Sequence, residues 1–271
     1  MQLQSSSVSD IGKIRQNNED SYLELKIDER DGYSLLLVVA DGMGGHNAGE
    51  VASKTVVESI ESYFKSEESN LNSDKTLSHL KESIEKANSA VIKASASDES
   101  LKGMGSTCTA IMILNNMTFV AHVGDSRAYL IRGKKINQIT KDHTLAEKML
   151  ESGIITKEEA KTSPHRNMLM KAIGIEDKVE VETYDPFNVK PGDVYLLCSD
   201  GLTEYLEEEE LCSIINIYEP QEACKLLVNI ANKRGGKDNI TVQIAKVMDL
   251  KAEENNDFMS NLKKNNSGNT N

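Results

Sequence analysis

The sequence predicts an α+β fold in which pairs of helices cover a sandwich of antiparallel sheets. Short runs of β-branched and apolar residues, separated by Gly, Asn and Asp turns, indicate antiparallel strands in several parts of the chain. Two long amphipathic segments follow the first strands, and a second helical pair precedes the last strand. Because a helix has one apolar stripe to bury, a four-layer α-β-β-α sandwich of two antiparallel sheets flanked by helix pairs would bury every stripe.

The first strands fall within residues 1–40, around a Gly-Lys turn. A polar segment from Arg15 to Asp20 separates an early β-like stretch from a strand over 21–27. The glycine-rich stretch DGMGGHNAGE comes next, and apolar residues then recur every three or four positions over 48–64 and over about 75–96. This spacing predicts two amphipathic helices. Their apolar faces contain Val51, Ala52, Val56, Ile60 and Phe64 in the first, and Leu77, Leu80, Ile84, Ala87, Val91 and Ile92 in the second.

The middle of the chain changes to short strands. The runs 107–114, 118–123 and 127–132 are β-branched and are separated by Asn-Asn and Gly-Asp-Ser turns, which predicts an antiparallel meander. Residues 141–185 have short helical pieces and few long apolar runs. We expect this segment to be an insertion that lies over the fold.

The last part of the chain predicts a strand over 194–198, helices over 208–217 and 221–233, and a closing strand over 240–247. We therefore expect one domain over residues 1–248. The polar remainder, 249–271, has scarcely an apolar residue and is expected to be disordered.

Composition excludes several classes of protein. The net charge of -12 and the pI near 5.0 repel phosphate backbones and anionic lipid, so neither nucleic acid nor a membrane surface is an expected partner. No apolar stretch reaches the roughly 20 residues that a bilayer span needs. The start MQLQSSSVSD has no basic, apolar signal pattern. We expect a cytoplasmic monomer.

The four cysteines form no CxxC pair and lie inside apolar patterns. This favours reduced core thiols over disulfides or zinc ligands. They are Cys108, Cys198, Cys212 and Cys224.

Aspartates recur where apolar runs end or begin. Asp41, Asp125 and Asp200 each follow a β-prone run, and Asp238 precedes the run ITVQIA. One such aspartate is usually a turn residue, but the repetition on several strands favours a cluster. Clustered carboxylates raise one another's pKa, so a cation is needed to neutralise them. Oxygen ligands alone indicate a hard divalent metal, Mg²⁺ or Mn²⁺.

Two neighbouring segments add candidates. In the run from Arg15 to Asp20, a guanidinium lies near two carboxylates; it forms either a surface ion pair or a fork for a phosphoryl group. In DGMGGH, Gly42 allows close approach of the backbone and offers its carbonyl as a ligand. His46 is either a polar residue at a helix start or a proton donor to a leaving oxygen.

Other catalytic motifs are missing from the sequence. It has no HExxH, no GxxxxGK[ST] and no GxSxG, and no cysteine precedes a phosphate-cradling loop that ends in arginine. The remaining histidines lie in ordinary positions: His122 in a strand, His143 in a turn, His165 in the insertion and His79 on an exposed helix face. Metal chemistry is therefore the favoured mechanism.

The ordered motifs resemble those of the bacterial branch of the PPM (type 2C) serine/threonine protein phosphatases. The resemblance covers about residues 8–247, and eight motifs in the same order make it specific. They are RQNNED (15–20), DGMGGHNAGE (41–50), GMGSTCTA (103–110), AHVGDSRAYL (121–130), ITKDHT (139–144), PHRN (164–167), LLCSDGLT (196–203) and GGKDNITV (235–242).

The resemblance implies two Mn²⁺ or Mg²⁺ ions in a cleft at one end of the sandwich, with a weaker third ion in addition. Asp41 would bridge the two ions and would also be catalytic, and the Gly42 carbonyl would bind one of them. Asp200 and Asp238 would complete the other.

The same resemblance assigns the remaining site residues. Glu19 and Asp20 match an acidic pair that acts largely through metal-bound water. Asp125 matches a position that helps Asp200 to hold the third ion, and Arg15 would hold the substrate phosphate.

The bacterial pattern gives the role of proton donor to His46. Many eukaryotic relatives have a histidine directly after Asp-Gly, where this chain has Met43. Residues 141–185 would form a mobile flap that shapes substrate choice. Ser163 stands before Pro164, where relatives often have histidine, which would alter flap contacts.

These assignments imply a hydrolysis without a phosphoenzyme. The paired ions lower the pKa of a bridging water, and the resulting hydroxide attacks phosphorus in line. Metal and Arg15 neutralise the developing charge, while His46 protonates the departing alkoxide.

The expected substrates are phosphoserine and phosphothreonine on proteins, with a cognate serine/threonine kinase as partner. One alternative is a pseudophosphatase that only binds a partner; such proteins lose metal-binding acids, and Asp41, Asp200 and Asp238 are all present here. The other is a metal-dependent phosphatase that acts on small molecules or on an anti-sigma-factor antagonist, which differs only in its substrate.

Overall fold

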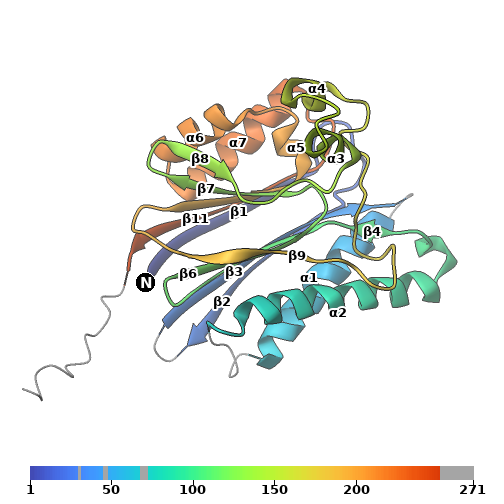
Figure 1. The fold of residues 1–271 in the computed structure, drawn as a ribbon, viewed down its shortest axis with the longest axis horizontal. Coiled ribbons are helices and arrows are strands. Elements are labelled where there is room, and N and C mark those ends of the chain that lie inside the picture. The colour runs from blue at the N-terminus through green and yellow to red at the C-terminus, as the bar shows by residue number, and fades with distance from the viewer. Residues whose placement is uncertain (30–31, 45–47, 68–72, 251–271) are drawn as a thin grey trace, which may run out of the picture.

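The computed structural model describes residues 1–29, 32–44, 48–67 and 73–250 of the chain. They form two stacked antiparallel sheets (Figure 1). The first sheet has the strand order β1-β11-β10-β7-β8, and the second has the order β2-β3-β5-β6-β9, with β4 paired to the end of β3. The bounds of the first sheet are β1 Gln2–Asp10, β11 Ile240–Asp249, β10 Val194–Cys198, β7 Arg127–Arg132 and β8 Lys135–Gln138; those of the second are β2 Asp20–Glu29, β3 Gly32–Met43, β5 Cys108–Leu114, β6 Met117–Val123, β9 Glu182–Asn188 and β4 Gly105–Ser106.

A helix pair covers the outer face of each sheet, as the amphipathic patterns predict. Helices α1 (Ala48–Glu67) and α2 (Thr76–Ser97) lie on the second sheet, and a short 3-10 turn, Glu99–Leu101, follows them. Helices α6 (Glu208–Ile217) and α7 (Pro220–Arg234) lie on the first sheet (Figure 1). The α-β-β-α sandwich is therefore confirmed.

The core has three layers because the inner strands alternate their side chains between two faces. On β3, Leu36 and Val38 face α1 and α2, whereas Leu35 and Leu37 face the other sheet. The third layer lies between the first sheet and α6 and α7. The four cysteines are free and buried, as expected.

The predicted meander is wrong at its third strand. β5 pairs with β6, but β7 pairs with β10 and β8 in the other sheet. The Gly-Asp-Ser turn resembles a hairpin in sequence, yet Gly124 has a φ of 112° and the chain crosses there from one sheet to the other. Asp125 therefore lies between the two sheets.

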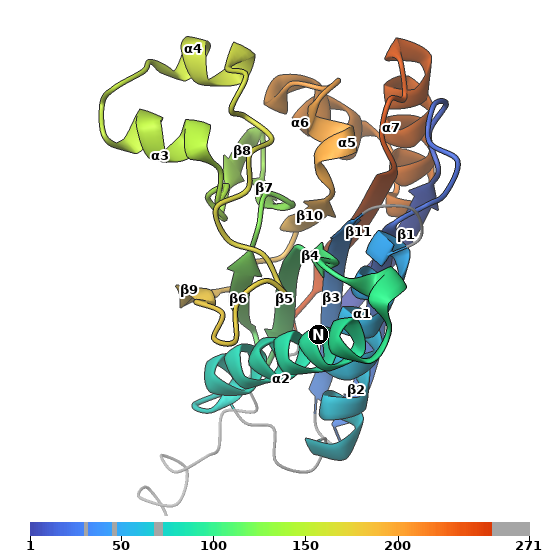
Figure 2. The same cartoon turned by 90° about the vertical axis from the view of Figure 1, so that its right-hand side faces the viewer.

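Residues 141–185 contain two short helices, α3 (Leu145–Glu151) and α4 (Lys157–Thr162), close to the expected pieces. Figure 2 shows both helices standing beyond one end of the sheets, beside α5 (Asp200–Thr203) and α6. The last residues of the segment do not lie over the fold, because they begin edge strand β9.

The end of the described chain belongs to the first sheet, since β11 continues to Asp249 opposite Gln2. The rest of the tail predicted to be disordered, residues 251–271, lies outside the described residues. Within the described part of the chain, every helix is too short or too polar to cross a membrane.

Candidate metal centre

The predicted acids come together at one end of the sandwich. Asp20 begins β2 and stands opposite Asp41 of β3 in the sheet register. Asp200 follows β10, and Asp238 precedes the neighbouring strand β11. Asp125 occupies the crossing from β6 to β7 at the same end. Both sheets therefore supply carboxylates to one place.

Burial and the repulsion of neighbouring charges raise the pKa values of four of these carboxyls, those of Asp20, Asp41, Asp125 and Asp200. Burial is the main cause for Asp20, whose pKa rises to about 7, with Asp200 and Asp238 adding repulsion and hydrogen bonds from Ser199 and Thr241 acting against it. Asp200 behaves alike: burial, then repulsion from Asp238, raises its pKa to about 6. Such groups are costly to ionise without a cation.

Asp41 and Asp125 are affected by the same charges. Burial, followed by the charges of Asp20 and Asp200, raises the pKa of Asp41 well above its ordinary value. Burial, followed by the charges of Asp200 and then Asp142, does the same to the pKa of Asp125, and nearby Arg127 partly offsets this. The cluster is therefore a site of strong negative potential.

Two buried oxygens in the cluster lack a hydrogen-bond partner among the described residues: Glu19 Oε1 and Asp20 Oδ1. The other oxygen of Asp20 accepts a hydrogen bond of 2.7 Å from Ser199 Oγ. A buried carboxylate oxygen without a donor is unfavourable unless a cation or ordered water satisfies it. The donor set, all oxygen, therefore fits a hard divalent ion.

The acidic side chains of the cluster are not already arranged around a single metal position. In the ranges 1–29, 32–44, 48–67 and 73–250, no three His, Cys, Asp or Glu side chains are gathered tightly enough to hold a metal ion as they are placed. Two observations therefore indicate that the cluster fits a cation. The carboxylates repel one another, and Glu19 Oε1 and Asp20 Oδ1 are buried without a hydrogen-bond donor within these ranges. Direct coordination by Asp41, Asp200 and Asp238 stays a prediction.

A network of hydroxyls fixes the backbone at Asp41. Its N–H donates to Thr107 Oγ1 over 2.9 Å, and its carbonyl accepts from Thr107 N–H over 2.8 Å. Ser106 Oγ also donates to that carbonyl, and Thr107 Oγ1 lies 2.8 Å from Ser126 Oγ. The GST stretch 105–107 is therefore a clamp on Asp41, a role that its sequence alone did not reveal.

Asn239 fastens the loop that carries Arg15 and Glu19. Its amide nitrogen donates to the carbonyls of Ile11 and Asn17, and its amide oxygen accepts from the Glu19 N–H over 2.8 Å. Sequence analysis missed this residue. A pattern in the sequence could have indicated Asn239. Three of the acids have a hydrogen-bonding residue directly beside them, in the pairs Asp125-Ser126, Ser199-Asp200 and Asp238-Asn239.

Arg15 reaches into the cluster. Its Nη2 donates to Asp238 Oδ2 over 2.7 Å, and Nη1 lies 3.8 Å from Glu19 Oε2. The side chain is 46% exposed, so a surface of the guanidinium remains open to solvent. The hydrogen bond to Asp238 is the main cause that raises the pKa of Arg15.

Gly42 occupies a position that no larger residue could fill. A Cβ there would lie 2.0 Å from the Gly49 carbonyl oxygen, and the Gly42 N–H donates to the Glu19 carbonyl over 3.0 Å. The backbone of β3 and the acidic loop are therefore in close contact. His46, the predicted proton donor, lies in 45–47, outside the described residues.

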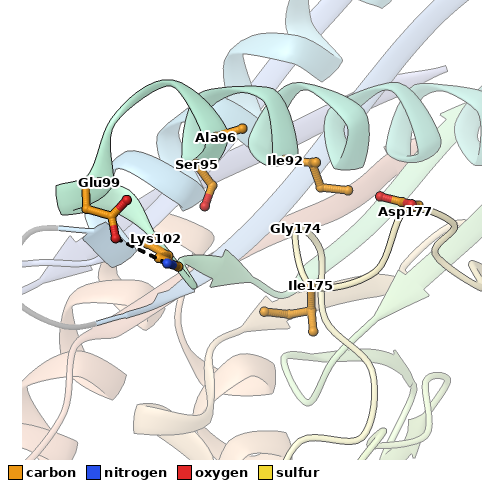
Figure 3. Close-up of a pocket in the computed structure, with 8 residues that line it drawn as sticks. All are labelled: Ile92, Ser95, Ala96, Glu99, Lys102, Gly174, Ile175 and Asp177. Atoms are coloured by element: carbon orange, nitrogen blue, oxygen red, sulfur yellow. Dashed lines mark hydrogen bonds and ion pairs between the residues drawn. The ribbon is translucent and has the colours of Figure 1, made fainter.

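Two cavities lie near this end of the molecule. One of about 1010 Å³ lies between residues of the 141–185 segment and the α5–α6 corner, and Asp125 and Asp200 line it. The other, of about 290 Å³, lies between α2 and the 174–177 loop (Figure 3). Figure 3 shows Ile175 and the Lys102–Glu99 ion pair beside it. Only the larger cavity includes acids of the cluster.

Residues 13–240 match the protein-family model described as protein phosphatase 2C. The chain belongs to this family. It is 38% identical over 236 residues to serine/threonine phosphatase stp of Listeria monocytogenes serotype 4b, covering 86% of this chain and 92% of that protein. This confirms the resemblance that the motifs indicated.

Solved structures of the family share the fold. The serine/threonine phosphatase PstP/Ppp of Mycobacterium tuberculosis aligns with a TM-score of 0.82 at 37% identity, over 91% of this chain and 99% of that one. The PstP catalytic domain, solved in complex with two manganese ions, aligns with a TM-score of 0.78 at 36% identity, over 91% and 99% of the two chains.

Proposed function

We propose that this protein phosphatase 2C enzyme hydrolyses phosphoserine and phosphothreonine on bacterial proteins, with divalent ions held by the acid cluster. The observation that carries the proposal is the convergence of five aspartates from both sheets, four of which have pKa values raised by burial and by neighbouring charges: Asp20, Asp41, Asp125 and Asp200. The fifth is Asp238, at the start of β11. Such a cluster is unfavourable by itself and favourable around cations.

Asp41, the Gly42 carbonyl, Asp200 and Asp238 would hold two ions, and Glu19 and Asp20 would act through ordered water. Asp125 would join Asp200 at a weaker third ion. When bound, Mn²⁺ or Mg²⁺ supplies Lewis acidity toward the phosphoryl oxygens and activates water. The PstP domain with two manganese ions supports Mn²⁺ as the first metal to test.

The chain's own residues would bind and orient the phosphoester. Arg15 has an open guanidinium face beside the cluster, and its planar fork suits two phosphoryl oxygens. Asn239 and Asp238 fix the loop that presents it. We assign protonation of the leaving alkoxide to His46, because an imidazole can donate a proton near neutral pH.

A cysteine nucleophile is disfavoured. Cys198 is buried, and this burial raises the pKa of its thiol to about 12, so the thiolate that attacks phosphorus is scarce at neutral pH. Burial raises the pKa of Cys108 to about 12 in the same way.

The wider setting is also a proposal. Phosphorylated proteins would be the substrates and a cognate serine/threonine kinase the partner. Free buried cysteines suit a reducing compartment, so we propose the cytoplasm. Residues 1–248 would form the phosphatase domain, and the 141–185 segment would be its flap.

The test is phosphate release from a phosphothreonine peptide by the purified protein. We expect turnover with Mn²⁺ or Mg²⁺, no turnover in EDTA, and none in Asp200→Ala, whose manganese binding is followed separately by calorimetry. Cys198→Ser serves as the control and should keep its activity. Turnover that survives EDTA but is lost in Cys198→Ser would overturn the proposal.

A further inference from the structure

A partly buried arginine next to the acid cluster, Arg127, has no role in the proposed chemistry. Arg127 begins β7, two residues after Asp125. Its Nε and Nη2 both bond the carboxylate of Asp142, with the shortest distance 2.7 Å, and Nη1 donates to Tyr129 Oη over 3.2 Å. Gln138 Nε2 donates to the same carboxylate. A planar fork of this kind fixes both position and angle.

Asp142 lies in the segment 139–144, which we call the strap. Besides the fork, the strap bonds both the β6–β7 crossing and the start of β7. Ile139 N–H donates to the Ala128 carbonyl over 2.7 Å, and His143 N–H donates to the Gly124 carbonyl over 2.7 Å. The Gly124 N–H in turn donates to His143 Nδ1. The strap is therefore fastened to the turn that carries Asp125.

The strap overlaps the start of the flap and also bonds later residues of it. Met170 N–H donates to the His143 carbonyl over 2.8 Å, and directly after the strap the Leu145 N–H donates to the Met168 carbonyl. His143 Nε2 lies 2.6 Å from Glu182 Oε2, at the start of β9. Any shift of the strap would therefore move the flap.

The fork stands on the wall of the larger cavity. Arg127 and Asp142 line this space of about 1010 Å³ together with Asp125 and Asp200, and residues of α3 and α4 line it as well. The acids lie at one part of the wall and the flap helices at another, so a polypeptide reaching the acids would pass the flap. A small aryl phosphate brings no polypeptide to contact the flap helices.

We propose that Arg127 and Asp142 are positioning residues for protein substrates, because their fork fixes the strap and thereby the flap beside the acid cluster. This inference rests on the proposed phosphatase function. It predicts that loss of the fork weakens binding of a phosphorylated protein and leaves turnover of a small phosphoester nearly unchanged.

The same strand offers a matched control. At the other end of β7, Arg132 forms an equivalent fork with Asp193, through Nε and Nη2 at 2.7 Å each. The exposed fractions of the two arginines are similar, 30% for Arg127 and 36% for Arg132. Arg132→Lys thus removes a fork of the same chemistry far from the acid cluster.

The experiment compares Arg127→Lys and Arg132→Lys on phosphorylated casein and on p-nitrophenyl phosphate, both with Mn²⁺. Lysine keeps the charge but cannot form the fork. For Arg127→Lys we expect KM for casein to rise about tenfold, with kcat and KM for p-nitrophenyl phosphate within about twofold of wild type. Arg132→Lys should change neither substrate's constants by more than about twofold.

A second measurement is independent of catalysis. Hydrogen exchange at the amides of Ile139 and His143 should quicken in Arg127→Lys and in Asp142→Asn, and stay unchanged in Arg132→Lys. Arg127→Lys and Asp142→Asn each break the same fork. The double variant should therefore show no greater rise in exchange or in KM for casein than the more affected single variant.

Two kinetic results would overturn the inference: equal losses on both substrates for Arg127→Lys, or the same casein defect in Arg132→Lys. Unchanged exchange at the strap in Arg127→Lys would overturn it as well. A wild-type protein inactive on both substrates would instead contradict the proposed function, and the exchange rates would still decide whether the fork holds the strap.

Discussion

Two aspartates at opposite ends of the sandwich, Asp193 and Asp41, have very different surroundings. Asp193, just before the strand, is 1% exposed and accepts both arms of Arg132 and the Lys190 N–H. Asp41, at the other end of the sandwich, faces Asp20 across the register and shares its field with three more acids. The first aspartate stabilises the fold, whereas the second is held in place against electrostatic repulsion, which points to a function for it.

The largest expected difference concerns activity when each carboxylate becomes an amide. Asp41→Asn should lower kcat/KM by roughly a thousandfold, because several kcal/mol of charge stabilisation at the metal centre are lost. In EDTA the same variant should melt at a higher temperature than wild type, since one repelling charge is gone.

Asp193→Asn is the control for that substitution. It should keep its activity and lose about 2 kcal/mol of unfolding free energy, a value reduced because Arg132 can reach water. Calorimetric melting and phosphate release should be measured on the same preparations of Asp41→Asn and Asp193→Asn, to compare stability and activity in each variant. Equal losses of activity in the two variants would contradict the distinction between a functional Asp41 and a structural Asp193.

A pair of buried threonines sharpens the comparison. Thr107→Val removes the hydroxyl that accepts from the Asp41 N–H, and Thr118→Val removes the one that bonds Tyr195 Oη over 2.6 Å. Each should cost roughly 1–3 kcal/mol of unfolding free energy. Only Thr107→Val should also lower kcat, by about 10- to 100-fold, because it loosens a candidate metal ligand. If Thr118→Val lowered kcat equally, the clamp on Asp41 would have no special role.

The smallest expected effect is a pH dependence of stability without metal. The native pKa values of Asp20 and Asp200, about 7 and about 6, lie above the ordinary 3.8. Folding therefore tightens proton binding, so this stabilisation is fully present below about pH 4 and is lost as the pH rises through about 6 and 7.

Urea unfolding in EDTA should give a smaller unfolding free energy at about pH 7.5 than at about pH 5, and Asp20→Asn should flatten the slope. Asp193→Asn, which lies outside the cluster, should leave the slope unchanged. A wild-type slope of the opposite sign would show that the acids are not repelled in the native state.

The sequence predicted what depends on local pattern. The spacing of Val56 and Ile60 indicated the helix, and the position of Asp41 and Asp200 after apolar runs indicated the cluster. Sequence reasoning did not find the roles of Thr107 and Asn239, because their bonds join residues 66 and 220 positions apart. Contacts of that kind leave no periodic signal.

Two errors in the predictions from sequence have the same origin. The turn at Gly124 looks like a hairpin locally, and only the pairing of β7 with β10 shows that the chain changes sheets there. Strand β9 is a polar, partly exposed edge with Pro186 in it, so it lacks the apolar alternation that marks other strands. In both cases a distant partner decided the structure.

The place of β11 carries a consequence for biosynthesis. This strand enters between β1 and β10, so β1 must wait for the much later β11 before their sheet can close. Asp238 and Asn239 arrive with it. A nascent chain halted before this strand would lack both the sheet partner of β1 and the fastening of the Arg15 loop. We therefore expect activity only after β11 has been made.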